Sequence, residues 1–179
     1  MKKFCISLFL LVIILLTVAC GADTATTKSQ EYLRIHIRAN SNEEEDQRIK
    51  YAVKDAVVNY LTPVVADCQT KAEAVEKINS KEKDIKYIVD EILLKNGFGY
   101  SSTVSVLNEE FPTRIYDEVT LEGGYYDALI IGLGSAEGDN WWCVVYPPLC
   151  FTYTKNVKYK SKILEIISRF KEKTATKGV

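Results

Sequence analysis

The sequence predicts a single α+β domain with a mostly antiparallel sheet, two N-terminal helices and one C-terminal helix. Helical periodicity dominates from Asn40 to Lys95, and short β-type segments dominate from Thr103 to Tyr146. Helices that come first and strands that follow one another are typical of α+β domains. Roughly 140 residues lie between the flexible ends, which is enough for one substantial core.

The first predicted elements are a strand and a helix. Apolar and polar side chains alternate strictly in Leu33–Arg38, which predicts a half-buried strand. Asn40 or Ser41 is then expected to cap a helix, because an acidic first turn follows. Pro63 is expected to close that helix.

The remaining elements follow in chain order. A second helix is predicted from about Lys71 to Lys95, with a possible break near Asn79-Ser80, where its apolar stripe loses register. The second half of the chain then alternates short strands with turns, as in an antiparallel sheet. Strands are predicted at 103–106, 119–121, 126–131 and 141–146, and a last helix at about 158–170.

The N-terminus resembles an export signal. Two lysines precede an apolar run from Phe4 to Ala19, so residues 1–19 are predicted to be a signal peptide. Three outcomes stay open: cleavage with lipidation of Cys20, cleavage without lipidation, and retention as a membrane anchor. All three place the folded part outside the cytoplasm. Residues 20–31 are predicted to form a disordered tether, residues 32–170 the domain, and residues 171–179 a flexible tail.

Four of the five cysteines lie beyond the predicted signal peptide. Cys143 and Cys150 are the candidate disulfide of an oxidising compartment. Seven extended residues would hold the two sulfurs far apart, so the chain has to reverse near Pro147-Pro148 for the bond to form. The alternative is that the cysteines, Cys68 included, are buried free thiols.

Composition argues against several function classes. Acidic residues outnumber basic ones 24 to 23, so nucleic acid is an unlikely ligand. A single histidine without paired cysteines leaves no framework for a metal, and no cofactor is predicted. The glycine-rich segment 132–138 lacks the Gly-Lys-Ser/Thr ending of a phosphate loop and predicts a tight turn. His36 is more consistent with a structural strand than with a Cys–His nucleophile.

Residues 140–151 hold both tryptophans, two cysteines and two of the four prolines. Tryptophan and tyrosine suit a half-buried recognition surface, although a core strand stopped by two prolines has the same composition. Trp141 and Trp142 must point to opposite faces if they lie on one strand. The predicted partner contacts are Trp141, Trp142, Tyr146, Pro147, Pro148 and Arg114.

The same segment resembles the signature of the stage II sporulation protein R family. Trp-Trp-Cys at 141–143 is followed, after three residues, by Pro-Pro-Leu-Cys at 147–150. Segments 33–41, 111–116 and 123–129 are similar to other blocks of that family, in the same order. The resemblance covers about residues 32 to 151.

The resemblance implies an intercellular signal of endospore formation rather than an enzyme. Family members are exported from the forespore towards the mother cell. There they trigger a membrane-embedded aspartic protease, which processes the pro-form of the early mother-cell sigma factor. The implied partner is the extracytoplasmic part of this protease. A lipoprotein-like Cys20 departs from the family pattern. The alternative function is a cell-envelope hydrolase or wall-binding domain.

Overall fold

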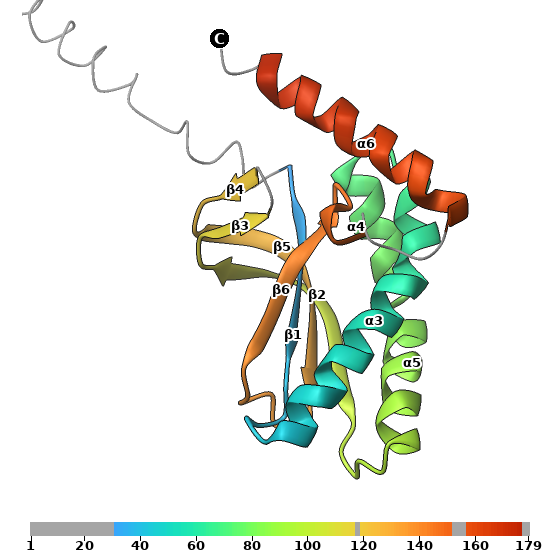
Figure 1. Ribbon diagram of the computed structural model, residues 1–179, viewed down its shortest axis with the longest axis vertical. Helices are drawn as coiled ribbons and strands as arrows, with labels where there is room; N and C mark the ends of the chain where they lie inside the picture. Colours follow the sequence, from blue (N-terminus) through green and yellow to red (C-terminus); the bar gives the residue numbers. More distant parts are fainter. Residues whose placement is uncertain (1–30, 117–118, 152–156, 177–179) are drawn as a thin grey trace, which may run out of the picture.

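The computed structural model describes residues 31–116, 119–151 and 157–176 (Figure 1). The predicted signal peptide, Cys20 and nearly all of the tether lie outside these residues. Eleven elements follow one another along the described chain: β1 (Leu33–Arg38), α3 (Glu44–Ala66), α4 (Lys71–Asn79), α5 (Glu82–Lys95), β2 (Ser102–Phe111), β3 (Arg114–Tyr116), β4 (Val119–Leu121), β5 (Gly124–Leu133), β6 (Asn140–Tyr146), the short 3₁₀ helix η1 (Leu149–Phe151) and α6 (Val157–Thr176). The predicted α+β class is confirmed.

The main sheet has four strands in the order β2-β5-β1-β6. Strand β5 pairs antiparallel with β2, and β6 pairs antiparallel with β1. The central pair β1 and β5 is parallel, with Ile35 opposite Leu129. The sheet is therefore mixed. The connection between the parallel strands β1 and β5 is long and contains α3, α4, α5, β2, β3 and β4.

The helices cover one face of the sheet (Figure 1). Alternate residues of β1 point into this layer, and Leu33, Ile35 and Ile37 are buried there. Helices α3 and α5 contribute apolar stripes at helical spacing, and α6 adds three isoleucines. The buried helix residues of this core are Ile49, Val53, Val57, Leu61, Val65, Ala66, Ala74, Ile78, Ile85, Val89, Leu93, Ile163, Ile166 and Ile167.

The opposite face, called the outer face below, carries a second and smaller core. It lies beneath the two-stranded hairpin β3–β4, which is a separate sheet (Figure 1). This core contains Tyr32, Phe111, Leu121, Tyr126, Ala128, Ile130 and Val144. The prediction that β1 is half-buried is wrong, because the hairpin and its aromatic neighbours also bury Arg34 and His36.

One helix boundary differs from the prediction, and the break that the prediction allowed near Asn79-Ser80 is present. Helix α3 continues past Pro63 to Ala66, with Leu61 and Val65 buried on either side of the proline. The apolar contacts of these residues outweigh the one backbone hydrogen bond that proline cannot make. The second predicted helix is divided into α4 and α5, which meet at Ser80 and Lys81. The break therefore falls where the apolar stripe loses register.

The last helix is longer than predicted. Helix α6 ends at Thr176, so it extends beyond the predicted domain boundary at residue 170. In the described ranges, no helix combines the length and the apolar character needed to span a lipid bilayer.

Candidate functional site

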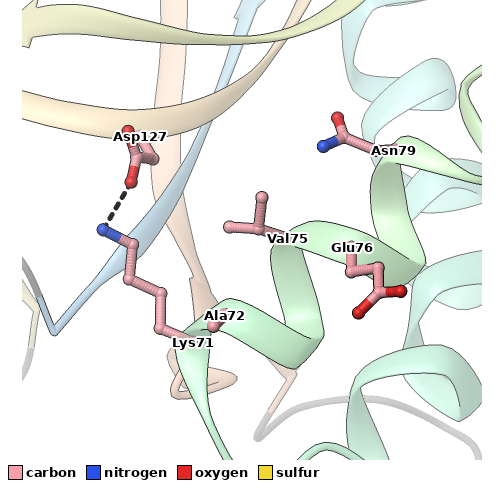
Figure 2. Close-up of a pocket in the computed structure, with 6 residues that line it drawn as sticks. All are labelled: Lys71, Ala72, Val75, Glu76, Asn79 and Asp127. Atoms are coloured by element: carbon pink, nitrogen blue, oxygen red, sulfur yellow. Dashed lines mark ion pairs between the residues drawn. The ribbon is translucent and has the colours of Figure 1, made fainter.

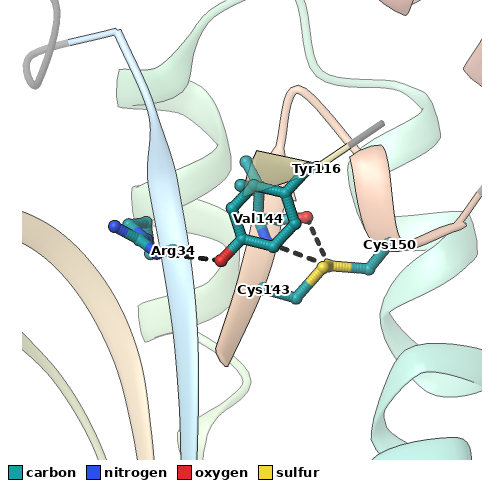
Figure 3. The surroundings of a disulfide bond; sticks show 5 residues. All are labelled: Arg34, Tyr116, Cys143, Val144 and Cys150. Atoms are coloured by element: carbon teal, nitrogen blue, oxygen red, sulfur yellow. Dashed lines mark hydrogen bonds between the residues drawn. A yellow bond between two sulfur atoms is a disulfide. The ribbon is translucent and has the colours of Figure 1, made fainter. Parts of the chain in front are cut away.

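The outer face of the sheet holds an arginine that is buried among aromatic rings. The side chain of Arg34 is fully buried, and its guanidinium carbon lies 4.1 Å from the ring centroid of Phe111 and 4.9 Å from that of Tyr126. Its Nη2 donates a hydrogen bond of 2.8 Å to the hydroxyl of Tyr116 on the hairpin (Figure 3). The described residues provide no hydrogen-bond partner for Nε or Nη1.

His36 lies two residues further along the same face of β1. Its ring packs against those of Trp142 and Phe111, at centroid distances of 5.2 and 5.8 Å. Burial lowers the pKa of His36 to about 4; the charges of Arg38 and Arg34 act in the same direction, and a side-chain contact with Asn140 opposes them. The imidazole is therefore neutral at pH 7.

The neutral state fixes how His36 meets Glu109. Its Nδ1 lies 3.0 Å from a carboxylate oxygen of Glu109, and a carboxylate only accepts. Nδ1 thus carries the proton and donates it, and the contact is a hydrogen bond rather than an ion pair. The negative charge of Glu109 is matched by Arg38, which also bonds to it. No hydroxyl or thiol of the described residues hydrogen-bonds to His36, so this histidine has no nucleophile beside it.

The structure separates the predicted contact residues into three groups. Trp142 and Arg114 meet on the outer face, where the guanidinium carbon lies 4.3 Å from the ring centroid. Trp141 points to the helix layer, with Lys54 Nζ 6.0 Å from its ring centroid. The other three residues of the predicted set are buried and do not lie on the surface: Tyr146, Pro147 and Pro148.

Cys143 and Cys150 form a disulfide, with their Cα atoms 6.0 Å apart. The chain reverses after β6 through a cis peptide bond before Pro147 and then the short helix η1. Cys150 Sγ also accepts a 2.9 Å hydrogen bond from the backbone N–H of Val144 (Figure 3). The disulfide thus covers a backbone donor at the free edge of β6, which protects that edge from pairing with another chain.

The third described cysteine is a buried free thiol. Cys68 donates from Sγ to the carbonyl of Val64 at 3.3 Å. Burial raises its thiol pKa to about 11, which suppresses the reactive thiolate. Among the described residues, no group of three His, Cys, Asp or Glu side chains is arranged to hold a metal ion.

The glycine-rich loop is a turn that packs against the connection after β1. Gly134 has a φ of 58°, as the expected tight turn requires. A Cβ on Gly138 would lie 2.1 Å from the carbonyl oxygen of Ser41, so only glycine fits there. Asn40 binds this loop by accepting from the backbone N–H of Ser135 at 2.9 Å.

Beside this loop lies a buried carboxylate, which belongs to the acidic first turn of α3. Asp46 accepts hydrogen bonds from Tyr100, Ser41 and Asn40 at 2.5, 2.6 and 2.8 Å. Burial alone would raise the pKa of Asp46, but these hydrogen bonds together hold it below its usual value. Asp46 therefore joins the start of α3 to the loop before β2.

A shallow depression lies elsewhere, between α4 and β5. Its volume is about 560 Å³, and it is lined by Lys71, Ala72, Val75, Glu76, Asn79 and Asp127 (Figure 2). Lys71 and Asp127 form an ion pair of 2.6 Å across one end. These two charges satisfy each other, and none of the buried side-chain atoms without a hydrogen-bond partner lies in this depression.

Comparison with known proteins identifies the family of the chain. The model of the stage II sporulation protein R family matches residues 29–156. The chain belongs to this family. It is also 37% identical over 161 residues to stage II sporulation protein R of Bacillus subtilis strain 168, covering 84% of this chain and 72% of that protein. No solved structure matches the chain.

Family membership supports a role in sporulation. The residues of the outer face also lie in the matched region. Arg34 and His36, the hairpin residues Arg114 and Tyr116, and Trp142 all fall in the segments that carry the resemblance. The sequence singled out Arg114 and Trp142. It did not single out Arg34, whose only signal was a charged residue on a strand that proved buried on both faces.

Proposed function

We propose that this protein is an exported signal of endospore formation that activates a membrane-embedded aspartic protease. The protease would then process the pro-form of the early mother-cell sigma factor. The observation that carries the proposal is the family match over residues 29–156, most of the described domain. The proposed location is the space between forespore and mother cell, with the domain free or held at the membrane by its N-terminal segment or a lipidated Cys20.

The outer face is the proposed contact with the extracytoplasmic part of the protease. It has a half-buried tryptophan under an arginine, a pair of residue types that often anchors protein interfaces. Ile115 on the hairpin is 71% exposed, and Leu107 on β2 is 55% exposed. Exposed apolar side chains around a partly buried aromatic residue favour a protein partner over a small substrate.

Activation requires that the domain binds the active state of the protease more tightly than the inactive state. A rigidly held anchor residue suits this role, because little conformational entropy is lost when it binds. The mixed sheet and the disulfide at β6 hold Trp142 in a fixed position. We infer that binding stabilises the active arrangement of the protease, which on this proposal is a dimer.

Co-production tests the proposal. The full chain is produced together with the protease and the sigma-factor precursor in a bacterium that does not form spores, and precursor cleavage is followed by immunoblot. Cleavage should depend on the chain. Cleavage that is the same with and without the chain would contradict activation, and the hydrolase or wall-binding alternative would then be tested on purified cell wall.

A matched pair of variants tests the contact surface. Ile115→Ser on the hairpin and Leu94→Ser on α5 remove apolar side chains of nearly equal exposure, 71% and 70%, from opposite layers. Both should leave thermal stability nearly unchanged, since neither side chain is buried. Ile115→Ser should reduce cleavage several-fold, and Leu94→Ser should not. Equal effects of the two changes on cleavage would contradict the proposal that the outer face is the contact surface.

A further inference from the structure

The buried guanidinium of Arg34 has an incomplete set of hydrogen bonds. Arginine stays charged in proteins, and a buried guanidinium normally meets a carboxylate or several carbonyl oxygens. Here its single hydrogen bond goes to a neutral hydroxyl, that of Tyr116. The rings of Phe111 and Tyr126 stabilise the charge in part, but in the described chain Nε and Nη1 have no acceptor.

This arrangement is a poor way to stabilise the fold. A buried charge without a full set of partners is destabilising compared with an apolar side chain of similar size. On the other face of the same strand, the buried positions are occupied by apolar side chains, those of Leu33 and Ile35. A guanidinium kept in this position therefore points to a ligand that completes its hydrogen bonds.

We propose that Arg34 anchors a carboxylate-binding site, which receives an acidic side chain of a protein partner in place of the Tyr116 hydroxyl. A carboxylate bonds most strongly to arginine in a bidentate manner, through Nη2 together with either Nε or Nη1. Nε and Nη1 are the two atoms without partners, and Tyr116 occupies the shared Nη2. The hydroxyl thus holds the position of one carboxylate oxygen.

The surroundings indicate that the carboxylate is carried by a protein. Tyr116 belongs to the hairpin whose neighbouring residue Ile115 is 71% exposed. A partner that docks on Ile115 therefore reaches the segment that covers Arg34. A free small carboxylate would gain nothing from these apolar contacts. The identity of the partner as the protease rests on the proposed function, whereas the carboxylate site itself does not.

The first experiment compares stability with activation. Arg34→Met and Arg34→Lys are introduced into the full chain, thermal unfolding is measured on the protein as the cells process it, and activation is measured by the co-production assay. Arg34→Met should unfold at the wild-type temperature or above, and should reduce activation about tenfold or more. Arg34→Lys keeps the charge but lacks the bidentate geometry, so it should also fail to activate. Arg38→Met is the matched control, because the Arg38 guanidinium already has Glu109, and it should lose less activation.

The second experiment uses acetate as a free carboxylate, with chloride at equal ionic strength as the reference. Acetate should raise the unfolding temperature of Tyr116→Phe, in which Nη2 is released, more than that of the wild type. It should leave Arg34→Lys and Arg34→Met unchanged. Even if Arg34→Met does not fold, the comparison of wild type, Tyr116→Phe and Arg34→Lys still shows whether a carboxylate binds at Arg34.

The outcomes separate the two proposals. If acetate shifts all variants equally, there is no carboxylate site at Arg34. If acetate binds at Arg34 but both Arg34 variants activate normally, the site takes a small free carboxylate, and the role of a partner's acidic side chain is overturned. If wild type and variants all fail to activate while acetate binds as expected, the proposed function fails and the site stands.

Discussion

The two faces of the six-residue strand β1 differ in the chemistry of their buried side chains. Leu33, Ile35 and Ile37 point into the helix layer and belong to its hydrophobic core. Arg34 and His36 point into the outer face, where they are equally buried but lie among aromatic rings with incomplete hydrogen bonds. The first face is what stability alone would select. The second carries polar groups that are costly to bury, which indicates selection for something other than stability.

The largest expected effect is on the helix-covered face. Ile35→Ala removes a side chain that is 1% exposed from the central strand, and it should lower the free energy of unfolding by about 2–5 kcal/mol. Urea denaturation measures this value. Arg34→Met, one residue earlier in the strand, should show no such loss. A loss of similar size at both positions would mean that the two faces are alike in their contribution to stability.

The next effect concerns the disulfide that follows β6. Cys150→Ser opens a loop of seven residues and removes the acceptor of the Val144 N–H, so it should cost about 2–3 kcal/mol of unfolding free energy. A reducing agent should destabilise the wild type by a similar amount and leave Cys150→Ser unchanged. If the reducing agent has no effect on wild-type unfolding, the bond is not formed in the purified protein.

A smaller, pH-dependent effect belongs to His36. Its folded pKa of about 4 lies below the ordinary value of 6.5, so the unfolded chain binds the proton more readily. The contribution of His36 is therefore fully present above about pH 6.5 and is lost as the pH falls towards 4, with about 1 kcal/mol lost by pH 6. His36→Gln should flatten the stability curve in this window relative to the wild type. Because the chain has one histidine, its NMR titration reports the pKa directly; a midpoint near 6.5 would show that the outer face is open to water.

Much of the fold was predictable because it rests on local periodicity. The apolar stripes of α3 and α5 and the alternation in β1 identify helices and strand by themselves. The break between α4 and α5 was also visible, as a loss of register near Asn79. The prediction that α3 ends at Pro63 was wrong. It followed from the general tendency of proline to end helices, whereas the burial of Leu61 and Val65 stabilises the helix beyond this residue.

The candidate site was predictable only in part. Trp142 and Arg114 stood out through residue type, and the structure brings them together. The contact between Arg34 and Tyr116 on the same face depends on how the hairpin β3–β4 lies on the sheet, which periodicity does not determine. The same limit applies to Tyr146, whose aromatic character suits a surface anchor and a core position equally well.

By itself, the sequence determined the α+β class, the opposite orientation of the two tryptophans and the family, because these depend on spacing and residue type along the chain. Only the tertiary structure decided the parallel pairing of β1 with β5, and the burial of Arg34 and His36 on the outer face. Both are set by contacts between segments about 80 to 100 residues apart. The energy of such contacts depends on which surfaces meet, and that information is not carried by any one segment.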